Sequence, residues 1–113
     1  MNFARKPALG LKQPPLVSTA LRQSAKGETC TLRLPGCIGG TETTVLAHLR
    51  FFGWAGIAQK PADFLAVYAC HHCHDVIDRR QDGEWGFEDL LRALGETLMR
   101  HHASGRMQFK ERR

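Results

Sequence analysis

The alternation of hydrophobic and polar residues predicts three short β-strands in the middle of the chain. Residues 30–37 read Cys-Thr-Leu-Arg-Leu-Pro-Gly-Cys and alternate with a period of two, which indicates a strand that turns at Pro35-Gly36. Residues 43–48 are rich in β-branched side chains and are expected to form the facing strand of a hairpin. Residues 64–68, Phe-Leu-Ala-Val-Tyr, predict a short buried strand.

Helical signals flank these strands. Ser18 or Thr19 can cap a short helix that runs to about Lys26 and stops at Gly27. A second helix is expected from about residue 70 to residues 81–83. The third helix is predicted over 86–103, because apolar residues recur there at helical spacing and would cover the core together with Trp85. These apolar residues are Phe87, Leu90, Leu91, Leu94 and Leu98. The predicted fold class is therefore α+β.

The length of 113 residues favours one domain with loose ends. Residues 1–17 contain Pro7, Gly10, Pro14 and Pro15, which break regular structure, so they are expected to form a flexible N-terminal arm. The folded domain is predicted over 18–103, with a long glycine-containing loop at 51–62, and residues 104–113 form a basic C-terminal tail. No apolar run approaches the roughly 20 residues of a membrane span, so we expect a cytoplasmic protein without membrane contact.

The net charge of +5 is unevenly distributed along the chain. Residues 1–60 sum to +6, residues 61–97 to −5 and residues 98–113 to +4. Basic flanks around an acidic centre suit a nucleic-acid partner, whose phosphates would contact the flanks while the acids hold cations. The alternative is a basic tail that only maintains solubility.

Four cysteines predict a structural metal site. Cys70 and Cys73 have the Cys-x-x-Cys spacing at which two thiolates grip one Zn²⁺, and Cys30 and Cys37 complete a tetrahedral set. A cytosolic location favours metal over disulfides. The alternative of a redox dithiol at Cys70 and Cys73 is weaker, because it would leave the other pair without a role.

A second group of polar residues suggests a catalytic ion. If the helix continues past Cys73, His74 and Asp78 stand at i and i+4 on one face, where they could hold a divalent cation. Upstream, His48 is an isolated histidine that could activate water. Taken alone, His48 could equally be a core histidine with its hydrogen bonds satisfied, and Asp78 could pair only with neighbouring basic side chains.

Two segments resemble motifs of the HNH endonucleases, and within them of the small prophage-encoded YbcO-like nucleases. Residues 46–50 read Leu-Ala-His-Leu-Arg, and residues 69–80 read Ala-Cys-His-His-Cys-His-Asp-Val-Ile-Asp-Arg-Arg. The resemblance covers about residues 18–82. It implies a ββα-metal architecture, in which a hairpin carrying a histidine precedes a helix that carries metal ligands, and it implies a DNA substrate with no small-molecule cofactor.

The resemblance also implies residue roles. His48 matches the general base, and His74 and Asp78 match ligands of one catalytic divalent ion, which could be Mg²⁺, Mn²⁺, Ni²⁺ or Zn²⁺. Arg50 lies two residues past His48, on the same side of a strand, and could clamp the scissile phosphate.

Two positions depart from the HNH pattern. Ala47 stands directly before the expected base, where many HNH enzymes have an acid or histidine, and the usual asparagine before the Cys-x-x-Cys is absent from residues 64–69. Asp63 is the nearest spare carboxylate, as an additional metal ligand or as a hydrogen-bonding substitute for the asparagine. The sequence therefore predicts a metal-dependent HNH-type endonuclease, with a non-catalytic zinc-stapled DNA-binding or scaffold protein as the alternative.

Overall fold

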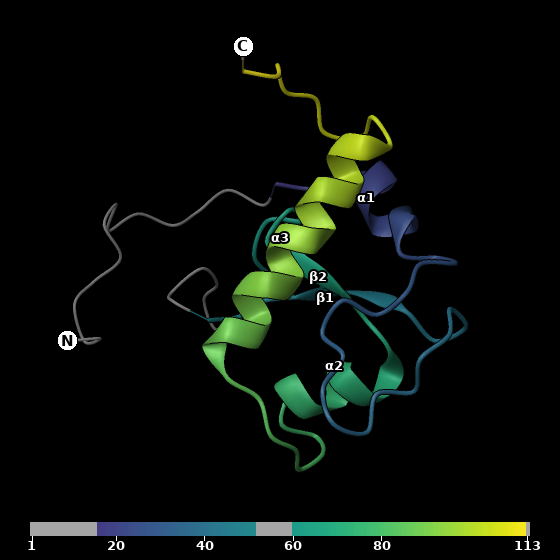
Figure 1. Cartoon of the computed structure of the whole chain (residues 1–113), viewed down its shortest axis with the longest axis vertical. Helices are drawn as coiled ribbons and strands as arrows, with labels where there is room; N and C mark the ends of the chain where they lie inside the picture. Colours follow the sequence, from purple (N-terminus) through teal and green to yellow (C-terminus); the bar gives the residue numbers. More distant parts are fainter. Residues whose placement is uncertain (1–15, 52–59, 113) are drawn as a thin grey trace, which may run out of the picture.

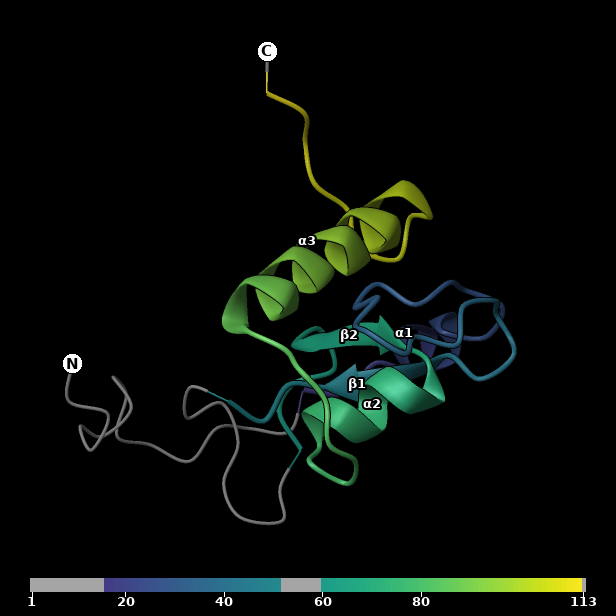
Figure 2. The same cartoon turned by 60° about the horizontal axis from the view of Figure 1, so that its bottom comes forward.

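A computed structural model describes residues 16–51 and 60–112 of the chain. Two short antiparallel strands form the centre of the fold, and three helices pack around them (Figure 1). The elements are α1 (Thr19–Ser24), β1 (Val45–His48), β2 (Ala66–Ala69), α2 (His71–Ile77) and α3 (Phe87–Ala103). The two strands lie between α3 and α2 (Figure 2). The predicted α+β class is confirmed as a small domain with a two-stranded sheet.

The pairing of the strands differs from the predicted hairpin. β1 pairs with β2, in a register that sets Val45 opposite Ala69 and His48 opposite Ala66. Residues 30–37 were expected to pair with β1 but form no strand. Over residues 32–34 the side chains instead alternate between the core and the surface without forming a strand. Leu32 and Leu34 are buried, whereas Arg33 between them is exposed.

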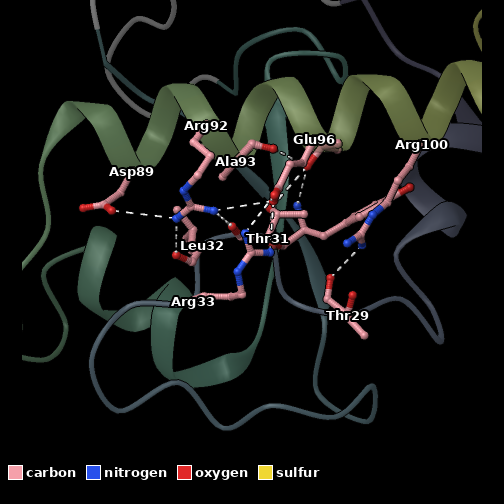
Figure 3. Close-up of polar contacts among 11 residues, drawn as sticks. Thr29, Thr31, Leu32, Arg33, Asp89, Arg92, Ala93, Glu96 and Arg100 are labelled. Carbon is pink, nitrogen blue, oxygen red and sulfur yellow. Dashed lines mark hydrogen bonds and ion pairs between the residues drawn. The ribbon is translucent and has the colours of Figure 1, made fainter.

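The backbone of residues 30–37 finds its hydrogen bonds outside a sheet ladder. The Thr31 N–H donates to the Tyr68 carbonyl at 2.7 Å, and Arg92 of α3 donates to the carbonyls of Thr31 and Leu32, each at 2.8 Å (Figure 3). Arg33 has a φ of 48°, which is incompatible with an extended strand. These hydrogen bonds take the place of those that a partner strand would make to the backbone of Thr31 and Leu32.

The first two helices begin at the predicted residues and end earlier than predicted. Ser18 caps α1, since its hydroxyl accepts from the Leu21 N–H at 3.2 Å, and the helix ends at Ser24. Cys70 caps α2, which ends at Ile77 rather than near residues 81–83. The chain leaves α2 through a turn in which Arg79 has a φ of 61°, so the helix cannot continue.

The last helix matches its predicted range but buries a different face. The residues of α3 with no more than 1% exposure are Leu90, Ala93, Thr97 and His101. Of the predicted apolar stripe, Leu90 lies in the core and Leu94 packs against it, while Phe87 and Leu91 are more than half exposed. Trp85 packs against the edge of the core, with its ring 5.4 Å from that of Phe51. Polar residues thus supply half of the face of α3 that contacts the sheet.

A buried polar network fixes α3 to β2. The Tyr68 hydroxyl donates to Ser24 Oγ at 2.9 Å and lies 3.3 Å from Nδ1 of His101. Arg106, within the basic tail expected from the sequence, donates to both His101 Nδ1 and the Tyr68 hydroxyl at 3.1 Å. Thr97 Oγ1 accepts from the Tyr68 N–H at 3.2 Å. The chain just after α3 therefore contributes to the folded domain.

We expect acid to destabilise the fold through His101. Burial lowers the pKa of His101 below its ordinary value, and the positive charge of the nearby Arg106 lowers it further. The unfolded chain takes up this proton near pH 6.5, whereas the folded state resists it, so the free energy of unfolding falls as pH drops below about 6.5. The slope from this one group is at most about 1.4 kcal/mol per pH unit.

Urea denaturation between pH 7.5 and 5 measures this effect. His101→Gln should show a shallower loss of stability with acid than the wild-type chain, while the neighbouring His102→Gln should follow the wild type. Parallel curves for all three proteins would contradict the assignment, because acid effects on the cysteines are common to them.

Candidate functional site

The four cysteines lie together in one cluster. Their Sγ atoms all lie within 4.8 Å of one another, and the Sγ atoms of Cys37 and Cys70 are 3.8 Å apart. Thiolates around a tetrahedral Zn²⁺ at about 2.3 Å would be about 3.8 Å apart, so the cluster needs little adjustment to hold such an ion. All four thiols are free, and a redox pair limited to Cys70 and Cys73 does not account for the other two.

The electrostatics of the thiols also fit a bound cation. Burial opposes ionisation of Cys70, yet the backbone N–H groups of Cys73 and Ile38 outweigh it and lower the pKa of Cys70 to about 7. Burial raises the pKa of Cys73, and the negative charge of Cys30 raises it further. The cluster therefore cannot carry four negative charges unaided, and a divalent cation relieves this repulsion.

The turn between Cys30 and Cys37 packs against His72, which lies between Cys70 and Cys73 in the sequence. Gly36 has a φ of 87°, and a side chain there would come within 2.6 Å of His72 Nε2. That nitrogen lies 2.9 Å from the Pro35 carbonyl oxygen, so His72 joins the two cysteine segments. His71 is mostly exposed and lies 3.2 Å from Asp75. Both histidines thus have partners within the protein.

A second site lies where β1 meets α2. A cavity of about 200 Å³ is lined by residues of the β1 segment, of α2 and its end, and by one lysine. Its lining residues are Leu46, His48, Arg50, Lys60, His74, Asp78 and Arg80. The structure thus brings together four residues that the sequence singled out for catalysis: His48, Arg50, His74 and Asp78.

Strand geometry explains the contribution of the β1 segment to this cavity. Successive side chains of a strand point to opposite faces, so Leu46 and His48 share one side while Ala47 and Leu49 share the other. Ala47 and Leu49 are fully buried in the core. Arg50 follows with the same alternation and lines the cavity as well.

The buried acid Asp63 lies behind His48. Its Oδ1 atom is 2.9 Å from His48 Nε2, and its Oδ2 atom accepts from the Ser18 N–H at 2.7 Å and from Arg22 Nε at 2.8 Å. Burial opposes ionisation of Asp63, but these hydrogen bonds from His48, Ser18 and Arg22 outweigh it and lower its pKa. Asp63 is therefore a carboxylate at neutral pH.

This contact determines the tautomer of the histidine. An ionised carboxylate can only accept a hydrogen bond, so Nε2 of His48 carries the proton and Nδ1 carries the lone pair. Because His48 is held on one side by Asp63 and is only 10% exposed, the ring has little freedom to rotate. In the neutral form of the ring, this contact leaves Nδ1 as the atom that can accept a proton.

His74 and Asp78 lie together on the helical side of the cavity. His74 Nε2 is 3.1 Å from Asp78 Oδ2, as their i,i+4 spacing predicts. Burial lowers the pKa of His74, although the negative charge of Asp78 opposes this shift. The lowered pKa keeps the ring neutral at pH 7. A neutral imidazole and a carboxylate are both suitable ligands for a divalent ion.

Three basic residues of this region were not predicted as part of the site. Lys60 and Arg80 line the cavity, and Arg22 holds Asp63. Arg80 also pairs with Asp78 at 3.0 Å and with Asp75 at 3.3 Å. The sequence offered only the Arg79-Arg80 pair after Asp78 as a signal. Nothing in the sequence separated Lys60 or Arg22 from ordinary surface bases.

Three aromatic rings lie together beside the cysteine cluster. The ring of Phe51, which packs against the core that contains Cys30, Cys70 and Cys73, contacts those of Trp85 and Phe87, at 5.4 and 6.2 Å. Phe52 and Trp54 lie outside the described residues.

Comparison with known proteins places this geometry in a family. A family model described as "Putative nuclease YbcO" matches residues 19–108. This chain belongs to the YbcO family. It is 52% identical over 81 residues to the "Putative nuclease YbcO" of Escherichia coli (strain K12), an alignment that covers 68% of this chain and 84% of the relative. A protein of the same description from Enterobacteria phage 82 aligns with the same identity and coverage.

A solved structure shares the fold. It is described as "Structure of a putative bacteriophage protein from Escherichia coli str. K-12 substr. MG1655", and it matches with a TM-score of 0.62 and 36% identity over 76% of this chain and 100% of that chain. The predicted YbcO resemblance is confirmed, and the two relatives, both described as "putative nuclease", occur in a phage as well as in a bacterium. Within the part of the chain that the structure describes, no helix is long and apolar enough to cross a membrane.

We expect one Zn²⁺ per chain at the four cysteines, and we expect it to be required for folding. Structural zinc contributes about 10–16 kcal/mol in small domains, comparable with a domain's whole free energy of unfolding of about 5–15 kcal/mol. Cys73→Ser should therefore lose the metal and the cooperative thermal transition. His71→Ser is the matched control, because it changes an exposed neighbour that is not a thiol.

Metal content by mass spectrometry and unfolding by circular dichroism provide the two measurements. A Cys73→Ser protein that retains one Zn²⁺ and melts with the wild type would refute the assignment. A disulfide in freshly purified wild-type protein would refute it as well.

Proposed function

We propose that this chain is a metal-dependent endonuclease of the HNH type that hydrolyses DNA phosphodiester bonds. One observation carries the proposal: His48, Arg50, His74 and Asp78 come from two segments of the chain and line one small cavity. A DNA-binding module has no need for a tautomer-fixed histidine opposite a histidine–aspartate pair. The order of β1, β2 and α2, with His48 and His74 on β1 and α2 and with Arg50 and Asp78 just after these elements, supports a ββα-metal site.

His48 is the general base in this proposal. Its Nδ1 lone pair takes a proton from a water molecule in the cavity, and the resulting imidazolium is stabilised by the Asp63 carboxylate at Nε2. Asp63 is therefore a positioning residue and not a metal ligand, because its oxygens already accept from His48, Ser18 and Arg22. It performs the hydrogen-bonding role that the absent asparagine has in other HNH sites.

His74 and Asp78 are the proposed ligands of the catalytic ion. A divalent ion bound there would neutralise charge on the scissile phosphate and on the leaving 3′ oxygen. Two protein ligands are sufficient for Mg²⁺ or Mn²⁺, which commonly retain water molecules and bind substrate phosphates directly. Arg50, Lys60 and Arg80 line the same cavity and supply positive charge for the phosphate.

The other candidate is a non-catalytic DNA-binding or scaffold protein with this fold. Its support is Ala47, which is fully buried and offers no ligand at the position before the base. In the described part of the chain, the cysteines form the only cluster of three or more potential metal-ligating side chains. The cysteine cluster and the basic flanks are compatible with either function. A measurement of DNA cleavage must therefore distinguish the nuclease from the non-catalytic protein.

A plasmid-nicking assay tests the proposed function directly. Zinc-loaded protein is incubated with supercoiled plasmid and Mg²⁺, Mn²⁺ or Ni²⁺, and nicked and linear products are quantified on gels. The proposal requires nicking with at least one ion. If the wild-type chain cleaves with none of the three, the non-catalytic function takes its place.

Single substitutions should separate the base from the metal ligands. His48→Ala removes the proton acceptor but leaves His74 and Asp78, so cleavage should fall about 10²–10⁴-fold while Mn²⁺ binding is retained. His74→Ala should lose Mn²⁺ binding as well as cleavage. Calorimetric titration of Mn²⁺ into each zinc-loaded variant supplies the comparison. A His48→Ala protein that cleaves at the wild-type rate would show that His48 is structural.

Asp63→Asn should lower cleavage by at least about 10-fold, without loss of Mn²⁺ binding. The amide cannot hold His48 in one tautomer as the carboxylate does, and groups that orient catalytic or metal-bound histidines commonly contribute about 10–100-fold. Arg22 contacts the same carboxylate but not His48, so Arg22→Gln should reduce cleavage less. Equal reductions in both variants would indicate that Asp63 acts only by holding α1.

A further inference from the structure

Arg79 occupies a backbone position that favours glycine. The turn after α2 has both bonds of a Schellman motif: the Arg79 N–H donates to the Val76 carbonyl at 3.1 Å, and the Arg80 N–H donates to the Asp75 carbonyl at 2.8 Å. Arg79 is the left-handed residue of this motif, with a φ of 61°. A side chain there destabilises the fold relative to glycine, so the arginine occupies this position at a cost in stability.

Arg33 shows how an arginine with a positive φ can offset that cost through its side chain. Among the described residues, Arg33 is the only other non-glycine residue with a positive φ. Its guanidinium binds both carboxylate oxygens of Glu96, at 2.7 and 3.0 Å, and so links the segment between Cys30 and Cys37 to α3 (Figure 3). Within the described chain, no such partner is present for the Arg79 side chain, which is exposed. Its neighbour Arg80 pairs with Asp75 and Asp78.

The space beside Arg79 adjoins the proposed catalytic cavity. A wider cavity of about 600 Å³ is lined by Arg50, Phe51, Ile77, Asp78, Arg79 and Arg80. It shares Arg50, Asp78 and Arg80 with the smaller cavity that contains His48 and His74. Phe51, which is partly exposed, provides apolar surface, and the arginines provide positive charge. A nucleic-acid strand offers the matching alternation of apolar sugar and base surface with phosphates.

We propose that Arg79 binds a backbone phosphate next to the scissile one, and that the wider cavity is the path by which the DNA strand leaves the catalytic site. This inference rests on the proposed nuclease function for the location of the scissile phosphate. The contact positions the strand and carries no base specificity, because it is made to the phosphate. The left-handed backbone of Arg79 directs the chain out of α2 at the rim of this path.

Substitutions at the two left-handed arginines provide a matched test. Arg79→Gly and Arg33→Gly each remove one positive charge and each place glycine where the backbone favours it. Arg79→Lys keeps the charge. Binding of a fluorescent DNA duplex is measured by anisotropy over a range of salt concentrations without added Mg²⁺ or Mn²⁺, and thermal melting is measured in parallel.

Arg79→Gly should weaken binding about 5–10-fold near 0.1 M salt and flatten the slope of log affinity against log salt by about 0.9, the value for one lost phosphate contact. Its melting temperature should be equal to or higher than that of the wild type. Arg33→Gly should keep the wild-type affinity and slope, and Arg79→Lys should keep most of the affinity.

Two results would overturn the inference. The first is wild-type affinity and slope for Arg79→Gly, and the second is an equal loss for Arg33→Gly, which would indicate a general charge effect. The nicking assay distinguishes this failure from failure of the nuclease function. A protein that nicks DNA but binds independently of Arg79 refutes only the phosphate contact. A protein that binds through Arg79 but never nicks refutes only the nuclease function.

Discussion

The direct junction of β2 and α2 at Cys70 is the constraint on which the rest of the structure depends. Ala69 is the last residue of the strand, Cys70 caps the helix, and His71 is its first residue, so no loop allows the two elements to shift. Because β2 is paired in register with β1, the junction also fixes where α2 runs relative to His48. Cys70 belongs to the thiol cluster as well, so the cysteines hold the start of the helix whose later residues face the cavity. A metal at the cysteines therefore supports the geometry of the second site without contacting it.

Features encoded by local spacing could be predicted from the sequence, whereas features that depend on distant partners could not. The cap at Ser18, the start of the second helix near residue 70 and the i,i+4 pair of His74 and Asp78 each follow from a few adjacent residues. The partner of β1 was wrongly predicted, because residues 30–37 alternate as a strand does. Their carbonyls instead bond to Arg92, about 60 residues away, and no local pattern signals such a contact.

The same distinction holds within the candidate site. His48 and His74 could be proposed from motifs, but the role of Asp63 depends on α1, whose Ser18 and Arg22 lie more than 40 residues from it in the sequence. A buried carboxylate is costly unless its oxygens are hydrogen-bonded, and here three donors share that task. The N-terminal helix is thereby part of the machinery that orients His48. It contributes no side chain to the cavity itself.

The network around Tyr68 has a consequence for the order in which the domain is assembled. All four cysteines and both strands lie within the first 73 residues, and Ser24 already accepts from the Tyr68 hydroxyl, but three further partners of Tyr68, namely Thr97, His101 and Arg106, come from the end of the chain. During synthesis the thiol cluster can close while the hydroxyl and N–H of Tyr68 still lack these partners. The last helix then completes the core from one side. A ribosome-bound chain that ends before residue 87 would hold all four cysteines without Leu90 and Ala93, which complete the hydrophobic core.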